Sequence, residues 1–347
     1  MTRLKLLLVL SAAFLFVLGC GVDTGAEFDD YEGEEFFSEE SAEVTEEAPA
    51  QDLEPAAGEG GSCPAVAEEI LKIATAPLEG EGSEATDDEV TLVNYIVNGD
   101  EISEPAFEDV PSELQDKQED EAAHLEIWNY FIALIPAENR GMIGEFAITT
   151  DGADNTLASV VQTESDPAVW KLNVDIADIA NRANLTYTLV HEFAHLLTLG
   201  PDQVTPSLAV FNNPEDNNIY LQEVSACPNY FPGEGCADAD SYVDDFYHQF
   251  WDELREEWNE INLEEDEDTR LEKQDAFYQK YQDRFLTDYA ATNSEEDIAE
   301  SWAFFIFSPK PAGDTIAEQK ILFFYKYPEL VALRSEILSN LCANFPQ

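Results

Sequence analysis

The sequence predicts an α+β domain in which a small mixed sheet precedes a mostly helical C-terminal half. Two observations carry this prediction. The strand-like patterns all end by residue 174, and helical patterns fill most of the chain after residue 183. Strands before helices, rather than in strict alternation with them, are typical of the α+β class. A length of 347 residues is ample for one substantial core.

The first half of the domain should open with a short helix over residues 64–75. Alternating apolar residues, bounded by turn residues, predict strands. These are expected over residues 90–97, 143–149, 158–163 and 170–174. Asn98-Gly99-Asp100 supplies a turn, and residues 119–135 have helical periodicity up to Pro136.

The second half should consist of helices with apolar stripes. They are expected over residues 183–199, 240–261, 264–288, 294–307, 316–325 and 328–341. The aromatic stripe of residues 240–261 is interpreted as core packing and not as a ligand platform.

The N-terminus looks like a secretion signal. Basic residues precede an apolar run from Leu6 to Leu18, and Gly19-Cys20 follows. This order is typical of a secretory signal rather than a membrane span. A Cys at this place resembles the bacterial lipoprotein signal, so residues 1–19 are predicted to be removed and Cys20 to be lipidated. The alternative is an ordinary signal peptide with an incidental Cys.

The distribution of charged residues separates the N-terminal segment from the rest of the chain. Acidic residues number 74 against 16 basic ones, which gives a net charge of −58. Such a surface repels phosphates, so nucleic acid is excluded as a partner. Residues 20–61 are acidic and contain no Lys or Arg, and we expect them to form a disordered tether before a domain at 62–347. The predicted location is the extracytoplasmic side of a bacterial membrane.

Four cysteines remain once the predicted lipid-bearing one is set aside, an even number that suits an oxidising compartment. Cys227 and Cys236 lie nine positions apart around prolines and glycines, so they are the favoured pair. Cys63 would then bind Cys342. Three connectivities are open from the residues alone.

The chemistry is concentrated in His191-Glu192-Phe193-Ala194-His195. Two His residues four apart on a helix lie on one face and can bind one metal ion, while the Glu between them can take a proton from a metal-activated water. Two buried core histidines are the alternative. The pattern predicts a zinc site with Glu192 as the general base.

A third protein ligand must come from elsewhere, because catalytic zinc keeps one position open for water. Pro201 stands where a third His of the extended motif would lie. Glu296 and Glu300 are four apart on a later predicted helix. Glu296 is the predicted ligand, and Glu300 is predicted to accept the N–H of a ligand His.

The segment from Tyr289 to Glu300 resembles the peptidase domain of anthrax lethal factor and its relatives. In that family a Tyr lies seven residues before the ligand Glu with Thr-Asn between them, as do Tyr289, Thr292-Asn293 and Glu296 here. The wider pattern also resembles uncharacterised bacterial zinc-peptidase lipoproteins. The resemblance implies a zincin fold, one Zn²⁺ at His191, His195 and Glu296, and Tyr289 facing the reacting carbonyl. The sequence departs from that family by a long insertion over residues 201–288.

The function expected from these features is a zinc metallopeptidase that acts on protein or peptide substrates. Residues 170–174 are the candidate edge strand for an extended peptide. The competing hypotheses are a zincin-fold binding or adhesion module without turnover and a metal-buffering acidic lipoprotein. A calcium site is weakly indicated by Asp238, Asp240, Asp244 and Asp245. His124 and His248 are interpreted as surface or hydrogen-bonded histidines, not as ligands.

Overall fold

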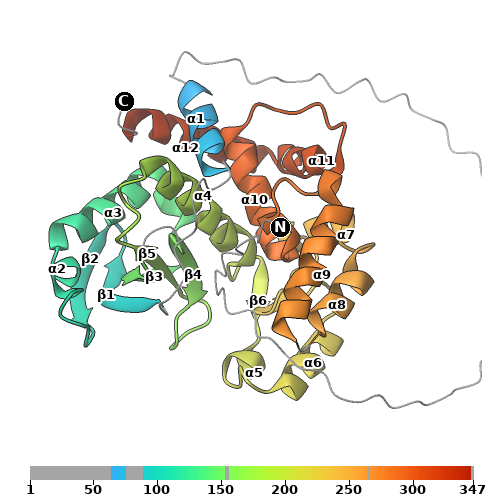
Figure 1. Cartoon of the computed structure of the whole chain (residues 1–347), viewed down its shortest axis with the longest axis horizontal. Helices are drawn as coiled ribbons and strands as arrows, with labels where there is room; N and C mark the ends of the chain where they lie inside the picture. The colour runs from blue at the N-terminus through green and yellow to red at the C-terminus, as the bar shows by residue number, and fades with distance from the viewer. Residues whose placement is uncertain (1–63, 76–88, 153–155, 265, 345–347) are drawn as a thin grey trace, which may run out of the picture.

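The computed structural model describes residues 64–75, 89–152, 156–264 and 266–344. It has the predicted α+β architecture, with a mixed sheet in the first half and helices over most of the second (Figure 1). The predicted signal peptide, Cys20, the acidic tether and Cys63 lie outside the described residues, so those predictions stay predictions. None of the described helices combines the length and hydropathy that a membrane span requires.

The main sheet has five strands in the order β2-β1-β3-β5-β4. Their bounds are Val90–Asn98 for β1, Glu101–Phe107 for β2, Ile143–Thr150 for β3, Ala158–Gln162 for β4 and Trp170–Asp175 for β5. β3 and β5 run parallel, and the other neighbours are antiparallel. The expectation that residues 170–174 form an edge strand is therefore wrong. β5 is covered on both sides, and the edge beside it is β4.

The strand β2 was not predicted, because most of its side chains are exposed and no apolar alternation marks it. It forms by pairing with β1 across the turn at Gly99, whose φ of 64° favours glycine. A second, two-stranded sheet of β6 (Val204–Pro206) and β7 (Gly235–Ala237) lies within the insertion and was also not predicted.

The helices of the first half are α1 (Pro64–Ala74), α2 (Gln115–Gln118), α3 (Glu121–Leu134) and α4 (Arg182–Leu199). Those of the second half are α5 (Leu208–Phe211), α6 (Asn217–Ala226), α7 (Tyr242–Phe250), α8 (Arg255–Asn262), α9 (Glu267–Lys280), α10 (Ser294–Phe307), α11 (Ile316–Phe323) and α12 (Pro328–Asn344). The helix expected over residues 264–288 is shorter and ends at Lys280.

The single helix expected over residues 240–261 is in fact two helices, α7 and α8. α7 ends at Phe250, and the turn that follows places Trp251 and Leu254 in the core at 2% and 1% exposure. α7 buries Phe246, Tyr247 and Phe250, and the partly buried Trp258 of α8 packs against the same core. The apolar pattern therefore continues across the break and conceals it. The interpretation of this stripe as core packing is confirmed.

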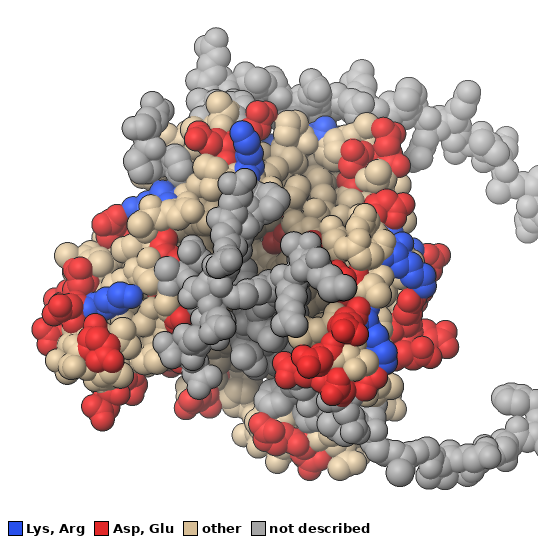
Figure 2. Space-filling view, in the orientation of Figure 1, with Lys and Arg blue, Asp and Glu red and all other residues tan. Residues whose placement is uncertain are grey.

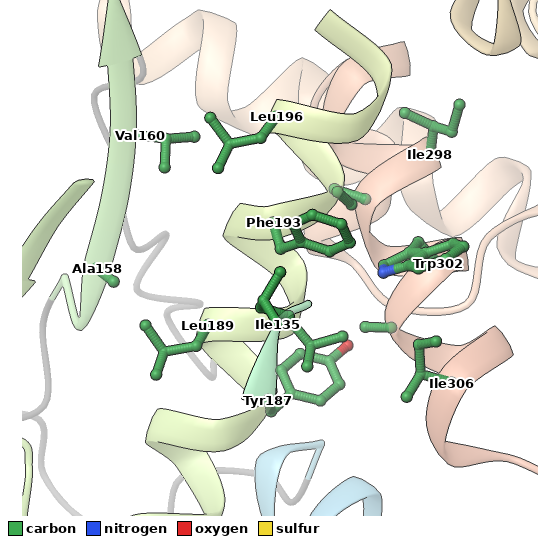
Figure 3. Close-up of a cluster of buried hydrophobic side chains, with 14 of the residues drawn as sticks. Ile135, Ala158, Val160, Tyr187, Leu189, Phe193, Leu196, Ile298, Trp302 and Ile306 are labelled. Carbon is green, nitrogen blue, oxygen red and sulfur yellow. The ribbon is translucent and has the colours of Figure 1, made fainter. Parts of the chain in front are cut away.

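The core is built around α4, which lies between the sheet and α10 (Figure 1). Leu196 of α4 faces Val160 of β4 and Leu189 faces Ala158, while Phe193 faces Trp302 of α10 (Figure 3). The ring centroids of Phe193 and Trp302 are 6.1 Å apart. Because α4 is buried on both faces, its polar side chains need hydrogen-bond partners within the protein.

One buried ion pair fixes α10 to its neighbours. The Lys320 ammonium group of α11 lies 2.5 Å from Oδ2 of Asp297, and both side chains are fully buried. The indole N–H of Trp251 donates to the same oxygen at 2.8 Å. α10, α11 and the end of α7 therefore meet at one carboxylate.

Acidic side chains are spread over much of the face in Figure 2, with few basic ones between them. This distribution agrees with a solvated surface that carries the chain's net charge of −58.

Candidate metal centre

The two motif histidines project from the middle of α4. Asn181 caps the helix by accepting a hydrogen bond from the N–H of Asn184 at 3.2 Å. His191 and His195 are 5% and 6% exposed, and their ring centroids are 5.0 Å apart. The helix thus presents both imidazoles on one face, as the spacing predicts.

The first two turns of α10 supply two carboxylates to the same place. Asn293 is the N-cap, and its side chain accepts from the N–H of Glu296 at 2.7 Å. Glu296 and Glu300 are 2% and 4% exposed. Packing of α10 against α4 brings them to the histidines across more than a hundred residues of sequence.

Three ligand atoms converge on one point. Nε2 of His191 lies 3.0 Å from Oε2 of Glu296 and 3.2 Å from Nε2 of His195, which lies 3.4 Å from the same Glu296 oxygen. Ligands about 2.0–2.1 Å from a tetrahedral metal are roughly 3.3 Å from one another, so these separations fit a zinc-sized ion.

The chemistry of these atoms also requires a positive charge. Nδ1 of His191 donates to Glu300 at 2.9 Å, which leaves a lone pair on Nε2 of the neutral ring. That lone pair faces a carboxylate and a second imidazole nitrogen. Burial lowers the pKa of His191, but the hydrogen bonds with Glu296 and Glu300 outweigh it, so this pKa lies well above its ordinary value. The two carboxylates therefore favour positive charge at this ring, which a proton on Nε2 supplies without metal and a bound cation would supply in its place. The residues present fit a bound cation.

Glu192 belongs to the same group, since its carboxylate and the ring nitrogens of His191 and His195 lie within 4.8 Å of one another. Two carboxylates, from Glu192 and Glu296, therefore approach the imidazole pair. Glu296 contacts both Nε2 atoms directly, so its geometry is that of a ligand, which leaves Glu192 for other chemistry.

Glu300 is held by two hydroxyl groups that sequence reasoning missed. Its Oε2 accepts from Thr287 Oγ1 at 2.7 Å and from Tyr187 Oη at 3.0 Å, while Oε1 accepts from His191. A carboxylate anchored in this way fixes the ring orientation of the histidine. Tyr187 lies four positions before His191 on α4, a same-face spacing that was the available signal.

Glu192 lies between the metal-ligating face of α4 and the edge strand. It is 4% exposed and forms a hydrogen bond with the backbone of Val160 in β4. Burial raises the pKa of Glu192 to about 7. A carboxyl group with this pKa can take up and release a proton near neutral pH.

Tyr289 stands over His191, with their ring centroids 5.9 Å apart. Burial and the charges of Glu296 and Glu192 raise the pKa of its hydroxyl well above the ordinary value. Tyr289 therefore keeps its proton and can donate a hydrogen bond next to the ligand atoms.

The other sequence candidates lie elsewhere. His124 is fully buried, and its ring nitrogens are hydrogen-bonded with the Tyr95 hydroxyl and the Lys117 carbonyl. His248 is exposed beside Asp252. The metal-ligating group found among the described residues does not include the four aspartates that suggested calcium: Asp238, Asp240, Asp244 and Asp245.

The insertion adds a closed loop beside the centre. Cys227 and Cys236 form the predicted disulfide. Cys342 is also disulfide-bonded, and its predicted partner lies outside the described residues. β6 and β7 approach so closely that a Cβ on Gly235 would lie 2.0 Å from the Thr205 carbonyl oxygen. The glycine is therefore required for the pairing that positions this loop.

Comparisons with models of protein families, with curated proteins and with solved structures find no match to this chain.

Proposed function

We propose that the chain is a zinc-dependent metallopeptidase. The observation that carries this proposal is the convergence of two imidazole nitrogens and a carboxylate oxygen, mutually 3.0–3.4 Å apart, in a buried site with a second carboxylate beside it. A donor set of two nitrogens and one oxygen is typical of zinc, whereas calcium and magnesium prefer oxygen alone.

His191, His195 and Glu296 would hold the metal, and Glu300 would orient His191. When bound, zinc supplies Lewis acidity, which polarises a peptide carbonyl and acidifies a water. Three protein ligands leave room for the reacting groups.

Glu192 takes the proton from the attacking water and delivers it to the amine that leaves. Tyr289 donates a hydrogen bond to the oxyanion that forms on the carbonyl. The edge strand β4, which contacts Glu192 through Val160, aligns an extended peptide by strand addition. This strand takes the place of β5 in the sequence-based hypothesis.

The second candidate is a binding or adhesion module that keeps the metal but has no turnover. A module of this kind has no use for a buried base or a hydroxyl donor, yet Glu192 and Tyr289 lie together at the centre. Metal buffering explains this arrangement even less well, since it needs no ordered second carboxylate.

The location that we propose is the extracytoplasmic side of a bacterial membrane, with a lipid on Cys20 and the acidic segment as a tether. Incorporation of labelled fatty acid into the wild type but not into Cys20→Ala is the expected result. Label in both proteins would contradict it.

The decisive experiment compares wild type with Glu192→Gln. Zinc content is measured by atomic absorption, and hydrolysis is measured on a mixed peptide pool by mass spectrometry. Both proteins should hold one zinc per chain. The loss of a general base should lower kcat by roughly 10²- to 10⁴-fold.

A matched control is Glu256→Gln, an acidic residue on the exposed side of α8, which should behave as wild type. Stoichiometric zinc with no cleavage of any peptide would favour the binding module. Absence of zinc from protein refolded with excess metal would refute the proposal.

A further inference from the structure

We propose, resting on the metallopeptidase function, that the insertion over residues 201–288 acts on the metal centre through Tyr230, a positioning residue for the ligand Glu296. Tyr230 lies in the loop that the Cys227–Cys236 disulfide closes. Its hydroxyl group holds the first turn of α10, which carries Glu296. The insertion would thereby fix the place of the third ligand before a metal binds.

The Tyr230 hydroxyl group contacts the first two residues of α10. It donates a hydrogen bond to Oε1 of Glu295 at 2.5 Å and lies 2.7 Å from Oγ of Ser294. Ser294 is 2% exposed and donates to Oε2 of Glu295 at 3.0 Å. Hydrogen bonds to a carboxylate are stronger than those between neutral groups. Since each of the three groups contacts the other two, the start of the helix cannot shift without breaking such a bond.

The insertion also fixes Tyr230 itself. Its N–H donates to Oδ1 of the buried Asp244 in α7 at 2.7 Å, and its carbonyl oxygen accepts from the N–H of Ala237 in β7 at 2.9 Å. Its ring stacks on Tyr247 of α7, with the centroids 3.7 Å apart. Since β7 also contains Cys236, the disulfide constrains the strand that holds Tyr230.

The contacts of the insertion lie on both sides of the N-cap of α10. Glu296 follows Glu295 in the helix, and its N–H donates to the side chain of the N-cap Asn293 at 2.7 Å. On the other side of the cap, the indole N–H of Trp258 in α8 donates to the Thr292 carbonyl oxygen at 2.9 Å. A carboxylate ligand held in this way has little freedom left to lose when it binds a metal.

The alternative is that Tyr230 only stabilises the fold. Its hydroxyl group would then contribute to Tm but not to the metal affinity of the folded protein, which is measured well below Tm. A positioning role predicts a loss of affinity instead. Without the hydroxyl group the first turn of α10 is ordered only when the metal binds, and this cost lowers the affinity.

The variant Tyr230→Phe removes the hydroxyl group and keeps the ring. In a chelator competition its zinc affinity should fall roughly 10-fold, the lower end of the range for groups that orient metal ligands. The visible spectrum of the Co²⁺-loaded variant should keep the band positions of wild type, because the ligands are the same. The matched control is Tyr242→Phe, which also removes a hydroxyl group that donates to a carboxylate, that of Glu329 at 3.0 Å. It should bind zinc as wild type does.

Two further comparisons test the same contact. Glu295→Gln keeps an oxygen that can accept from Tyr230, so it should bind zinc more tightly than Glu295→Ala. If the disulfide acts through Tyr230, replacing Cys227 and Cys236 with Ser should lower zinc affinity, and this loss should be less than additive with that of Tyr230→Phe. The Glu295 pair provides the test if the Cys variant fails to fold.

Equal zinc affinity of Tyr230→Phe and Tyr242→Phe would overturn the inference, as would additive losses in the Cys and Tyr230 variants. Wild type that holds one zinc and cleaves peptides would in that case leave the metallopeptidase function intact. Wild type that holds no zinc would instead refute that function itself.

Discussion

Lys320 offers a test of how the helix that carries Glu296 is held in place. Its ammonium group lies 2.5 Å from Asp297 at 0% exposure. Burial raises the pKa of Asp297 to about 6 and lowers the pKa of Lys320. Desolvation therefore outweighs the mutual attraction for each partner, and the pair is costly to bury and costlier to break.

The variant Lys320→Met keeps the length of the side chain and removes its charge. Removing one partner of a buried pair costs about 3–5 kcal/mol, which lowers Tm by about 6–20 °C. The cost should be smaller at pH 5 than at pH 8. Lys320 holds the pKa of Asp297 down, so the variant's buried carboxyl has a still higher pKa. Stability from a carboxyl with a raised pKa is present at low pH and is lost as pH rises, and the variant loses more of it than wild type. Calorimetric melting at both pH values measures this.

The control is Lys310→Met, because Lys310 is exposed and contacts only the face of Tyr325 at 4.6 Å among the described interactions. It should change stability by less than about 0.5 kcal/mol. Combining Lys320→Met with Asp297→Leu should recover much of the loss, although the Trp251 N–H then lacks its acceptor. If Lys320→Met alone stayed within about 0.5 kcal/mol of wild type, the range of ordinary surface substitutions, the reasoning would be refuted.

Three further outcomes are expected. Glu300→Ala should weaken zinc affinity by roughly 10- to 100-fold in a chelator competition, and Glu300→Gln should weaken it less. Equal affinity in wild type and both variants would contradict the role of this carboxylate. Replacing Cys227 and Cys236 with Ser should cost roughly 2–3 kcal/mol in chemical denaturation, and an unchanged midpoint would be inconsistent with the loop being constrained. Glu234→Gln should lose less stability than wild type between about pH 5 and pH 8, because the carboxyl ionises in the unfolded chain over this range while burial, which raises its pKa to about 8, keeps it protonated in the folded protein. Parallel pH profiles of Tm would disprove this.

Local signals explain which parts of the fold could be predicted. α10 spans Ser294–Phe307 as expected, since Asn293 is a good N-cap and acidic residues fill the first turn. The strand β2 was not predicted, because most of its side chains face solvent and it forms only by pairing with β1. The order of strands in the sheet depends on such pairing throughout, so the edge position was assigned to the wrong strand.

The residues of the candidate metal centre also differ in how far the sequence could predict them. Fixed spacings along a helix revealed His191, His195 and the pair Glu296 and Glu300. Contacts between elements that are distant in sequence, such as Thr287 with Glu300, have no local pattern.

The distance between α4 and α10 along the chain has a consequence for biosynthesis. The histidines and Glu192 are made about a hundred residues before Glu296, and α10 depends on Lys320, which follows still later. Contacts of such long sequence separation form late in folding. If the proposed activity is correct, the growing chain is inactive for most of its synthesis. The order of residues would then protect an unfolded chain from its own hydrolysis without a separate inhibitory segment.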